Sequence, residues 1–202
     1  MTMRAWVSTL GILLATACAS SEVVVFEELF QEELAEGWHW LRERPEDWRL
    51  VDGGLELRAR PGVAETVTTA LLRPAPSLEA GPLIFEVTVT FLSEPTEQYE
   101  QAGLVWYDDG EPVFKLVHEL VDGELFMIPG RVPTTSSTVT LRLIVGEGRF
   151  TAQFRESPED SFQTVEEGNL ATGKNSQISL QTYHGPEAGE HWMRFTDFRI
   201  LR

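Results

Sequence analysis

Apolar and polar residues alternate with a period of two along several short stretches of the chain. In residues 83–91, Leu, Phe and Val occupy every second position, and residues 138–143 and 149–155 repeat the pattern. A period of two indicates strands with one buried face and one exposed face. Turn-forming pairs such as Asp-Gly and Pro-Gly separate the stretches, and the Gly-Glu-Gly at 146–148 predicts a hairpin. The chain is therefore expected to form an all-β, two-sheet antiparallel sandwich.

One stretch also fits a helix. Phe26, Phe30 and Leu34 are four residues apart within residues 26–37, as on one face of a helix. A short helical turn therefore remains open there. The rest of the chain shows no internal repeat or interdomain linker, and 202 residues suffice for one domain with a substantial core.

The charge of the chain limits its partners. Asp and Glu number 32 against 16 Lys and Arg, so the formal charge is −16. A polyanion would be repelled by this field, whereas nucleic-acid binders carry a basic surface. Nucleic acid is therefore not an expected partner.

The first 17 residues have the features of an export signal: Arg4, an apolar stretch at 6–15, and small residues at 15–17. Cys18, the single cysteine, follows at once. This arrangement resembles the lipobox of bacterial lipoproteins, which implies that Cys18 is lipidated and becomes the mature N-terminus. Ordinary secretory cleavage beside a chance cysteine is the alternative.

The lipobox resemblance sets the expected domain boundaries. Residues 18–25 would be a lipidated tether, and residues 26–202 the sandwich. The implied location is the bacterial cell envelope, with the lipid anchor as the contact with the membrane. Ala at position 19 rather than Asp resembles lipoproteins of the outer membrane in bacteria with two membranes.

Two strands can be paired by residue number alone. A loop at 108–111 lets residues 101–107 pair with 113–119 so that paired numbers sum to 220, which sets Tyr107 opposite Val113. The face toward the core is then mostly apolar and includes His118, which we expect to be packed and hydrogen-bonded. The opposite face is predicted to carry Gln101, Val105, Tyr107, Val113, Lys115 and Glu119.

A third strand extends this sheet. A two-residue turn at Asp122-Gly123 would place Leu125 and Met127 on the core side, and Phe126 and Ile128 beside the polar group.

The mixed face fits a shallow saccharide site. Amide, ammonium and carboxylate groups hydrogen-bond sugar hydroxyls, while aromatic rings cover the C–H side of a pyranose. His184, in a Gly-Pro loop, could line the edge of such a site. A solvated sheet exterior is the alternative interpretation.

Four motifs together resemble one known family. They are "GWHWLRE" at 37–43, "YEQAGLVWYDD" at 99–109, "FKLVHELVDG" at 114–123 and "FTDFRIL" at 195–201. The chain resembles the concanavalin A-like domains typified by the regulation-of-enolase proteins, and is similar to the C-terminal sandwich of β-xylosidases. The resemblance implies a jelly-roll-like sandwich with a carbohydrate-related role.

The resemblance also implies site residues. The polar positions of the family fall on Gln101, Lys115 and Glu119, and its tryptophan pair on Trp38 and Trp40; burial of both tryptophans in the core is the alternative. A segment that commonly carries Asp-Trp is "PGRVPTTSST" here, so one aromatic contribution to the rim is missing.

The superfamily often holds calcium between its first and last strands. The resemblance implies Glu28 and Asp197 as two oxygen ligands, with carbonyls and water completing the site. Glu28 stands where the family usually has Asp. The alternative is that Glu28 is a solvated acid and Asp197 a bulge residue.

The sequence offers little for catalysis. Glucanases of this superfamily place their catalytic carboxylates on one strand as Glu-x-Asp-x-x-Glu, and this spacing does not occur. Motifs of serine, zinc and P-loop enzymes are also missing from the sequence. We therefore expect a non-catalytic, membrane-anchored carbohydrate-binding domain that requires no cofactor. A structural envelope lipoprotein with a protein partner and a weak glycoside hydrolase are the alternatives.

Overall fold

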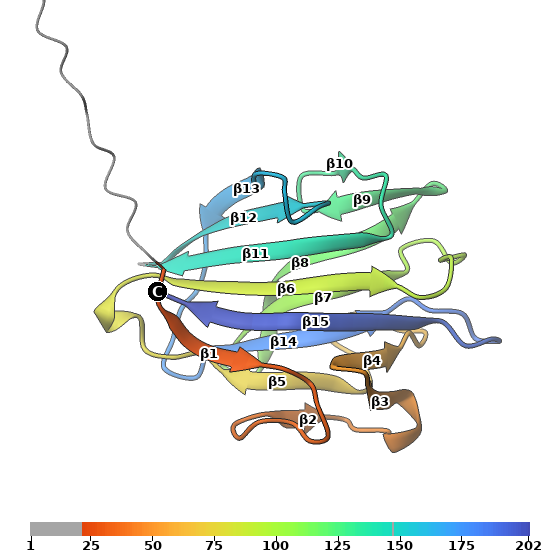
Figure 1. Ribbon diagram of the computed structural model, residues 1–202, viewed down its shortest axis with the longest axis horizontal. Coiled ribbons are helices and arrows are strands. Elements are labelled where there is room, and N and C mark those ends of the chain that lie inside the picture. The colour runs from red at the N-terminus through yellow and green to blue at the C-terminus, as the bar shows by residue number, and fades with distance from the viewer. Residues whose placement is uncertain (1–21, 147) are drawn as a thin grey trace, which may run out of the picture.

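A computed structural model describes residues 22–146 and 148–202 (Figure 1). The elements are β1 (Val24–Glu28), β2 (His39–Leu41), η1 (Pro45–Asp47), β3 (Trp48–Val51), β4 (Gly54–Arg58), β5 (Ala70–Pro74), η2 (Leu78–Ala80), β6 (Leu83–Phe91), β7 (Gln101–Asp108), β8 (Glu111–Val121), β9 (Glu124–Ile128), β10 (Val132–Pro133), β11 (Thr138–Gly146), β12 (Arg149–Arg155), β13 (Gln163–Asn169), β14 (Gln177–Tyr183) and β15 (Trp192–Leu201).

The strands form two antiparallel sheets that lie one in front of the other in Figure 1. Sheet A has the order β13-β12-β11-β6-β15-β4-β3, and β1 also pairs with β15. Sheet B has the order β10-β9-β8-β7-β14-β5-β2. The prediction of an all-β, jelly-roll-like sandwich in a single domain is confirmed.

The core fills the space between the sheets. The apolar half of the 83–91 alternation is buried, from Leu83 through Val89 to Phe91, as predicted. Trp106 on β7 is fully buried against Phe85 of β6, with ring centroids 5.6 Å apart. Its indole N–H donates to the Ala171 carbonyl at 3.0 Å, so this large side chain leaves no polar atom unpaired.

Asp-Gly pairs form the tight turns, as expected. Asp109-Gly110 joins β7 to β8, and Asp122-Gly123 joins β8 to β9. All four residues have positive φ, between 49° and 86°. Asp and Gly tolerate this region better than most residues, and two-residue turns of this kind match the twist of the paired strands.

The predicted register of β7 and β8 holds over most of its length. Gln101 lies opposite Glu119, and the sum of 220 continues to Trp106 and Phe114. The prediction is wrong at Tyr107, which lies opposite Pro112 rather than Val113, because a β-bulge shifts the register there. The turn occupies only residues 109 and 110. Between this turn and the Trp106–Phe114 pair, β8 therefore has three residues and β7 has two.

Residues 26–37 do not form a helix. The chain runs through β1 to Glu28 and then bends, and Phe30 is fully buried at a φ of 48°. The carboxylate of Glu28 accepts the backbone N–H groups of Phe30 and Ala35 at 2.9 Å. These bonds satisfy the backbone of the bend without a helix.

The tether was expected to extend to residue 25, but the sandwich already includes residues 23–25. Val23 exchanges backbone hydrogen bonds with Arg202, and β1 begins at Val24, so sheet A starts before residue 26. The export signal and Cys18 lie outside the described residues. Within residues 22–146 and 148–202, no helix is long and apolar enough to cross a membrane.

His118 lies on the core side of β8 and is fully buried, as predicted. Its Nε2 is 2.8 Å from the Thr134 hydroxyl, and its ring lies 5.0 Å from that of Phe91. Burial lowers the pKa of His118 to about 4 from the usual 6.5, and the Glu156 charge opposes this only partly. The core therefore holds a neutral imidazole.

The buried imidazole predicts a pH-dependent stability. The pKa of His118 is lower in the folded than in the unfolded chain, so its contribution is complete above pH 6.5 and falls as pH drops toward 4. The free energy of unfolding should fall by about 2 kcal/mol from pH 7 to pH 5 through this group. Urea titrations at several pH values should show that the free energy of unfolding depends less on pH in His118→Gln than in the wild type. An equal pH dependence in the two proteins would contradict the role of His118.

Candidate functional site

Three predicted residues meet on the outer face of sheet B. The Lys115 ammonium lies 2.8 Å from Gln101 Oε1 and 2.8 Å from Glu119 Oε2. Gln101 is held in turn by a 2.7 Å bond from its amide to the Tyr99 carbonyl. We call Gln101, Lys115 and Glu119 the polar cluster. Neighbouring strands bring the three together because alternate residues of β7 and β8 share a face.

The polar cluster keeps one exposed group. Gln101 and Glu119 are 1% and 5% exposed, whereas the Lys115 side chain is 36% exposed. An ammonium has three N–H donors, and the described residues engage two of them. One donor of Lys115 is therefore left for a ligand, while Gln101 and Glu119 fix its position.

A hollow of about 430 Å³ adjoins Lys115. Val105, Val113 and Ile128 supply apolar walls, and Glu65 contributes an exposed carboxylate at the rim. A shallow cavity with apolar walls and a few polar groups is the usual form of a small-ligand site.

Two further side chains border the polar cluster. Tyr99 is 47% exposed, and its ring lies 6.0 Å from that of His184. Burial lowers the pKa of His184, with Glu119 and Lys115 acting on it in opposite directions. His184 therefore lies near the edge of the polar cluster, as the sequence suggested, and is mostly neutral at pH 7.

Tyr107 shares the outer face of sheet B but is only 1% exposed. The segment that carries Ala64 and Val67 lies over it, and its hydroxyl is 3.2 Å from Gln181 Oε1 and 3.4 Å from the Ala64 carbonyl. Burial raises the pKa of this phenol. Tyr107 therefore lies on the predicted face of the sheet, but its ring is covered by the chain and is not open to a ligand.

The tryptophan pair lies on the opposite side of sheet B. Trp40 on β2 pairs with Leu71 of β5, a core residue, and its ring is 4.8 Å from that of Trp48. Trp38 packs edge-to-face on Phe198 at 5.0 Å. Both are half-buried and pack against the core between the sheets, so neither joins the polar cluster. For Trp40, the pairing of β2 with β5 sets this side.

Glu28 and Asp197 do not offer the expected calcium ligands. Glu28 is 3% exposed, and its two oxygens accept three N–H groups, including the Trp38 indole at 2.8 Å. Asp197 is exposed at a φ of 54° in a bulge of β15. A carboxylate filled by N–H donors is a poor partner for a cation that needs six to eight oxygens.

A glycine substitution tests the role of Asp197. Glycine adopts positive φ without steric strain, so Asp197→Gly should melt at or above the temperature of the wild type. Excess EDTA should not change the melting temperature of either protein. A fall in melting temperature on Asp197→Gly, together with a stabilisation of the wild type by added calcium, would support the calcium site instead.

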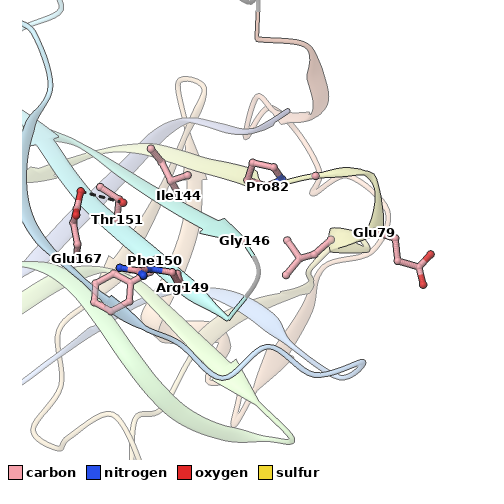
Figure 2. Close-up of a pocket in the computed structure, with 10 residues that line it drawn as sticks. Glu79, Pro82, Ile144, Gly146, Arg149, Phe150, Thr151 and Glu167 are labelled. Carbon is pink, nitrogen blue, oxygen red and sulfur yellow. Dashed lines mark hydrogen bonds between the residues drawn. The ribbon is translucent and has the colours of Figure 1, made fainter.

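A second hollow, of about 320 Å³, lies beside the β11–β12 hairpin (Figure 2). Pro82 and Ile144 line it, and Thr151 donates to Glu167 at 3.5 Å. Its three charged side chains, Glu79, Arg149 and Glu167, are all exposed. The hollow beside Lys115 is the stronger candidate, because the ammonium of Lys115 is half-buried and held in place by two hydrogen bonds.

The sequence reasoning missed the polar residues of β14. Ser179 and Gln181 are fully buried on the outer face of sheet B, and Tyr183 lies opposite Gln101. The signal was present, because Ile178 and Leu180 alternate with these residues in "ISLQTY" and point to the core. A third strand thus extends the polar face beyond β7 and β8.

Comparisons with known proteins find the fold but no sequence family. No protein-family model matches the chain, and a search of curated proteins finds no relative. Among solved structures, the GH43 protein BlXynB from Bacillus licheniformis matches with a TM-score of 0.68 and 13% identity, covering 87% of this chain and 39% of that one. The xyloglucan-locus protein GH43B from Bacteroides ovatus matches at 0.67 and 17%, covering 91% and 40%.

A smaller structure matches along nearly all of its own length. The CBM2 module of the Dit protein from Lactobacillus casei BL23 phage J-1 has a TM-score of 0.59 and 9% identity, covering 89% of this chain and 95% of that one. The chain spans about 40% of the GH43 structures. At these identities the likeness shows the fold alone: the predicted similarity to the β-xylosidase sandwich is confirmed at that level.

Proposed function

We propose that this protein is a non-catalytic carbohydrate-binding domain, held on the bacterial cell envelope through lipidated Cys18. The polar cluster beside the hollow carries the proposal, because it presents a fixed ammonium donor next to apolar walls. Sugar rings combine hydroxyl acceptors with apolar C–H faces, so the two kinds of surface match the two sides of one pyranose.

The similar structures support a carbohydrate-related role. They include GH43 proteins, a xylan β-1,4-xylosidase, endo-acting O-glycanases that initiate mucin breakdown, and an alginate lyase. These activities belong to those proteins. For this chain they favour a saccharide over other ligands of comparable size.

The anchor rests on the sequence of residues 1–18. In a bacterium with two membranes, Ala19 favours the outer membrane. Glu22 already forms an ion pair with Arg142 of sheet A, so only residues 19–21 separate Cys18 from the sandwich. The domain would therefore sit close to the membrane surface.

The binding role is favoured over hydrolysis for a chemical reason. Double-displacement hydrolysis of glycosides needs two carboxyl groups about 5–5.5 Å apart, one of them free to act as nucleophile. Glu119 is instead bonded to Lys115 and 5% exposed, and the sequence has no Glu-x-Asp-x-x-Glu motif. Glu119 therefore positions Lys115 rather than attacking a substrate.

Lysine substitutions test the site. On an array of neutral and acidic oligosaccharides, the full chain should bind a saccharide class, and Lys115→Ala should bind it at least about tenfold more weakly, as expected for the loss of one charge-assisted hydrogen bond. Lys174→Ala removes the only other lysine, which is exposed on the β13–β14 connection, and should bind like the wild type.

Two further assays, cross-linking and the release of reducing sugar, distinguish the alternatives. If the wild type binds no saccharide and a neighbouring envelope protein cross-links to Val113 or Tyr99, a protein-interaction role replaces the proposal. If the wild type releases reducing sugar and Glu119→Gln abolishes that turnover, the protein is a glycoside hydrolase.

A further inference from the structure

Residues 61–68 lie over the centre of the outer face of sheet B. Backbone bonds hold both sides of this segment: Gly185 N–H donates to the Arg60 carbonyl at 3.0 Å, and Thr69 N–H donates to the Arg42 carbonyl at 2.9 Å. Between these points His184 N–H donates to the Gly62 carbonyl at 3.2 Å, Val67 is buried, and the other residues are exposed or half-buried. We call residues 61–68 the cover.

Val67 anchors the cover. It is 1% exposed and belongs to an apolar cluster with Leu72, Val105, Tyr107 and Tyr183, apart from the core between the sheets. The contact is small compared with that core. Local segments held by few apolar contacts open at lower free energy than the whole fold.

The surface beneath the cover combines this apolar cluster with buried polar groups. Tyr107 and Ser179 both lie 3.2 Å from Gln181 Oε1, so this oxygen has two donors. Gln181 Nε2 and the Tyr183 hydroxyl are buried and have no hydrogen-bond partner among the described residues. Both groups lose their bonds to water when the cover is closed, which destabilises the closed form.

These unpaired groups adjoin the polar cluster. Tyr183 lies opposite Gln101 on the neighbouring strand, and the Lys115 ammonium is 6.0 Å from the Tyr183 ring centroid. Gln181 lies two residues along β14, on the same face. Once the cover is displaced, Lys115, Gln101, Tyr183, Gln181 and Tyr107 would form one continuous surface across β8, β7 and β14.

We propose that the saccharide site extends beneath the cover, where Gln181 Nε2 and the Tyr183 hydroxyl bind the ligand once residues 61–68 are displaced. The inference rests on the proposed carbohydrate-binding function and adds to it a longer site, suited to an oligosaccharide chain rather than one sugar ring. A face that served folding alone would be expected to pair every polar group that it buries, and Gln181 Nε2 and the Tyr183 hydroxyl are left unpaired among the described residues. The aromatic rings of Tyr107 and Tyr183 would then add to the stacking surface for the ligand.

The cover reduces the apparent affinity of the site. If the open form is a small fraction of molecules, the apparent Kd is the intrinsic Kd divided by that fraction. A change that weakens the closed form therefore tightens binding, which is the reverse of what a destabilising change does at a preformed site.

Two variants test the cover through binding to the oligosaccharide array. Val67→Ala should lower the melting temperature and tighten binding at least threefold, because it removes part of the anchor. Val89→Ala removes the same two methyl groups from the core between the sheets and should lower the melting temperature without tighter binding. Tyr183→Phe should weaken binding at least fivefold without lowering the melting temperature, since it removes an unpaired hydroxyl.

A thiol measures the opening without a ligand. In the full chain with Cys18→Ala, Ser179→Cys places a single buried thiol under the cover, and Ala102→Cys places one on the core face of the same sheet. Labelling with Ellman's reagent at increasing urea should be faster at position 179 and nearly independent of urea. Labelling at position 102 should follow global unfolding.

The outcomes separate the two proposals. If Lys115→Ala abolishes binding while Val67→Ala and Tyr183→Phe bind like the wild type, the carbohydrate site stands and its extension beneath the cover is wrong. If the thiols at 179 and 102 react at the same urea-dependent rate, the cover opens only with the whole fold and the inference fails. If neither the wild type nor Val67→Ala binds any saccharide, both proposals fail.

Discussion

The packing of sheet A against sheet B is the constraint on which the rest of the structure depends. Each strand gives alternate residues to the space between the sheets, and the large buried side chains Trp106, Phe85 and Phe195 fill it. Burial of apolar surface at about 25 cal/mol per Å² makes this the main driving force for folding. Because the inner faces carry that role, the outer faces are free to carry polar groups for other purposes.

The two outer faces use this freedom differently. On sheet A, Glu86 pairs with Arg142 and Arg199, and Glu56 pairs with Arg49 and Arg194. Each of these arginines is paired with a carboxylate of its own sheet. On sheet B, the ammonium of Lys115 is positioned by two neighbours and still exposed, and the next polar groups along the face are covered and incompletely paired. Groups that lower stability without a folding role are commonly found at functional sites.

Much of the fold followed from local patterns. Period-two alternation identified β6, β11 and β12, and the Asp-Gly turns fixed the register of β7, β8 and β9 to within one residue. The bulge at Tyr107 was not predicted. It arises because the two-residue turn leaves two residues on β7 and three on β8 between the turn and the Trp106–Phe114 pair. The bend after Glu28 was not predicted either, because the Glu28 carboxylate accepts its three N–H groups from residues up to ten positions away.

The sequence predicted the site residues only where a single hairpin determines which face of the sheet they occupy. Gln101, Lys115 and Glu119 lie on adjacent strands, so parity alone brought them to one face. Trp38 and Trp40 could not be placed, because their side is set by the pairing of β2 with β5 across the sheet. The cover over Tyr107 depends on a loop from a distant part of the chain, and no periodic pattern reports where such a loop folds.

The polar cluster is proposed to serve recognition and not stability. The melting temperature of the double variant Lys115→Met/Glu119→Leu tests it most directly, because apolar residues of similar size can replace a partly buried ion pair without loss when the pair has no folding role. If the polar cluster serves recognition, the double variant should melt at or above the temperature of the wild type. A melting temperature several degrees lower would show instead that the polar cluster holds the sheet together.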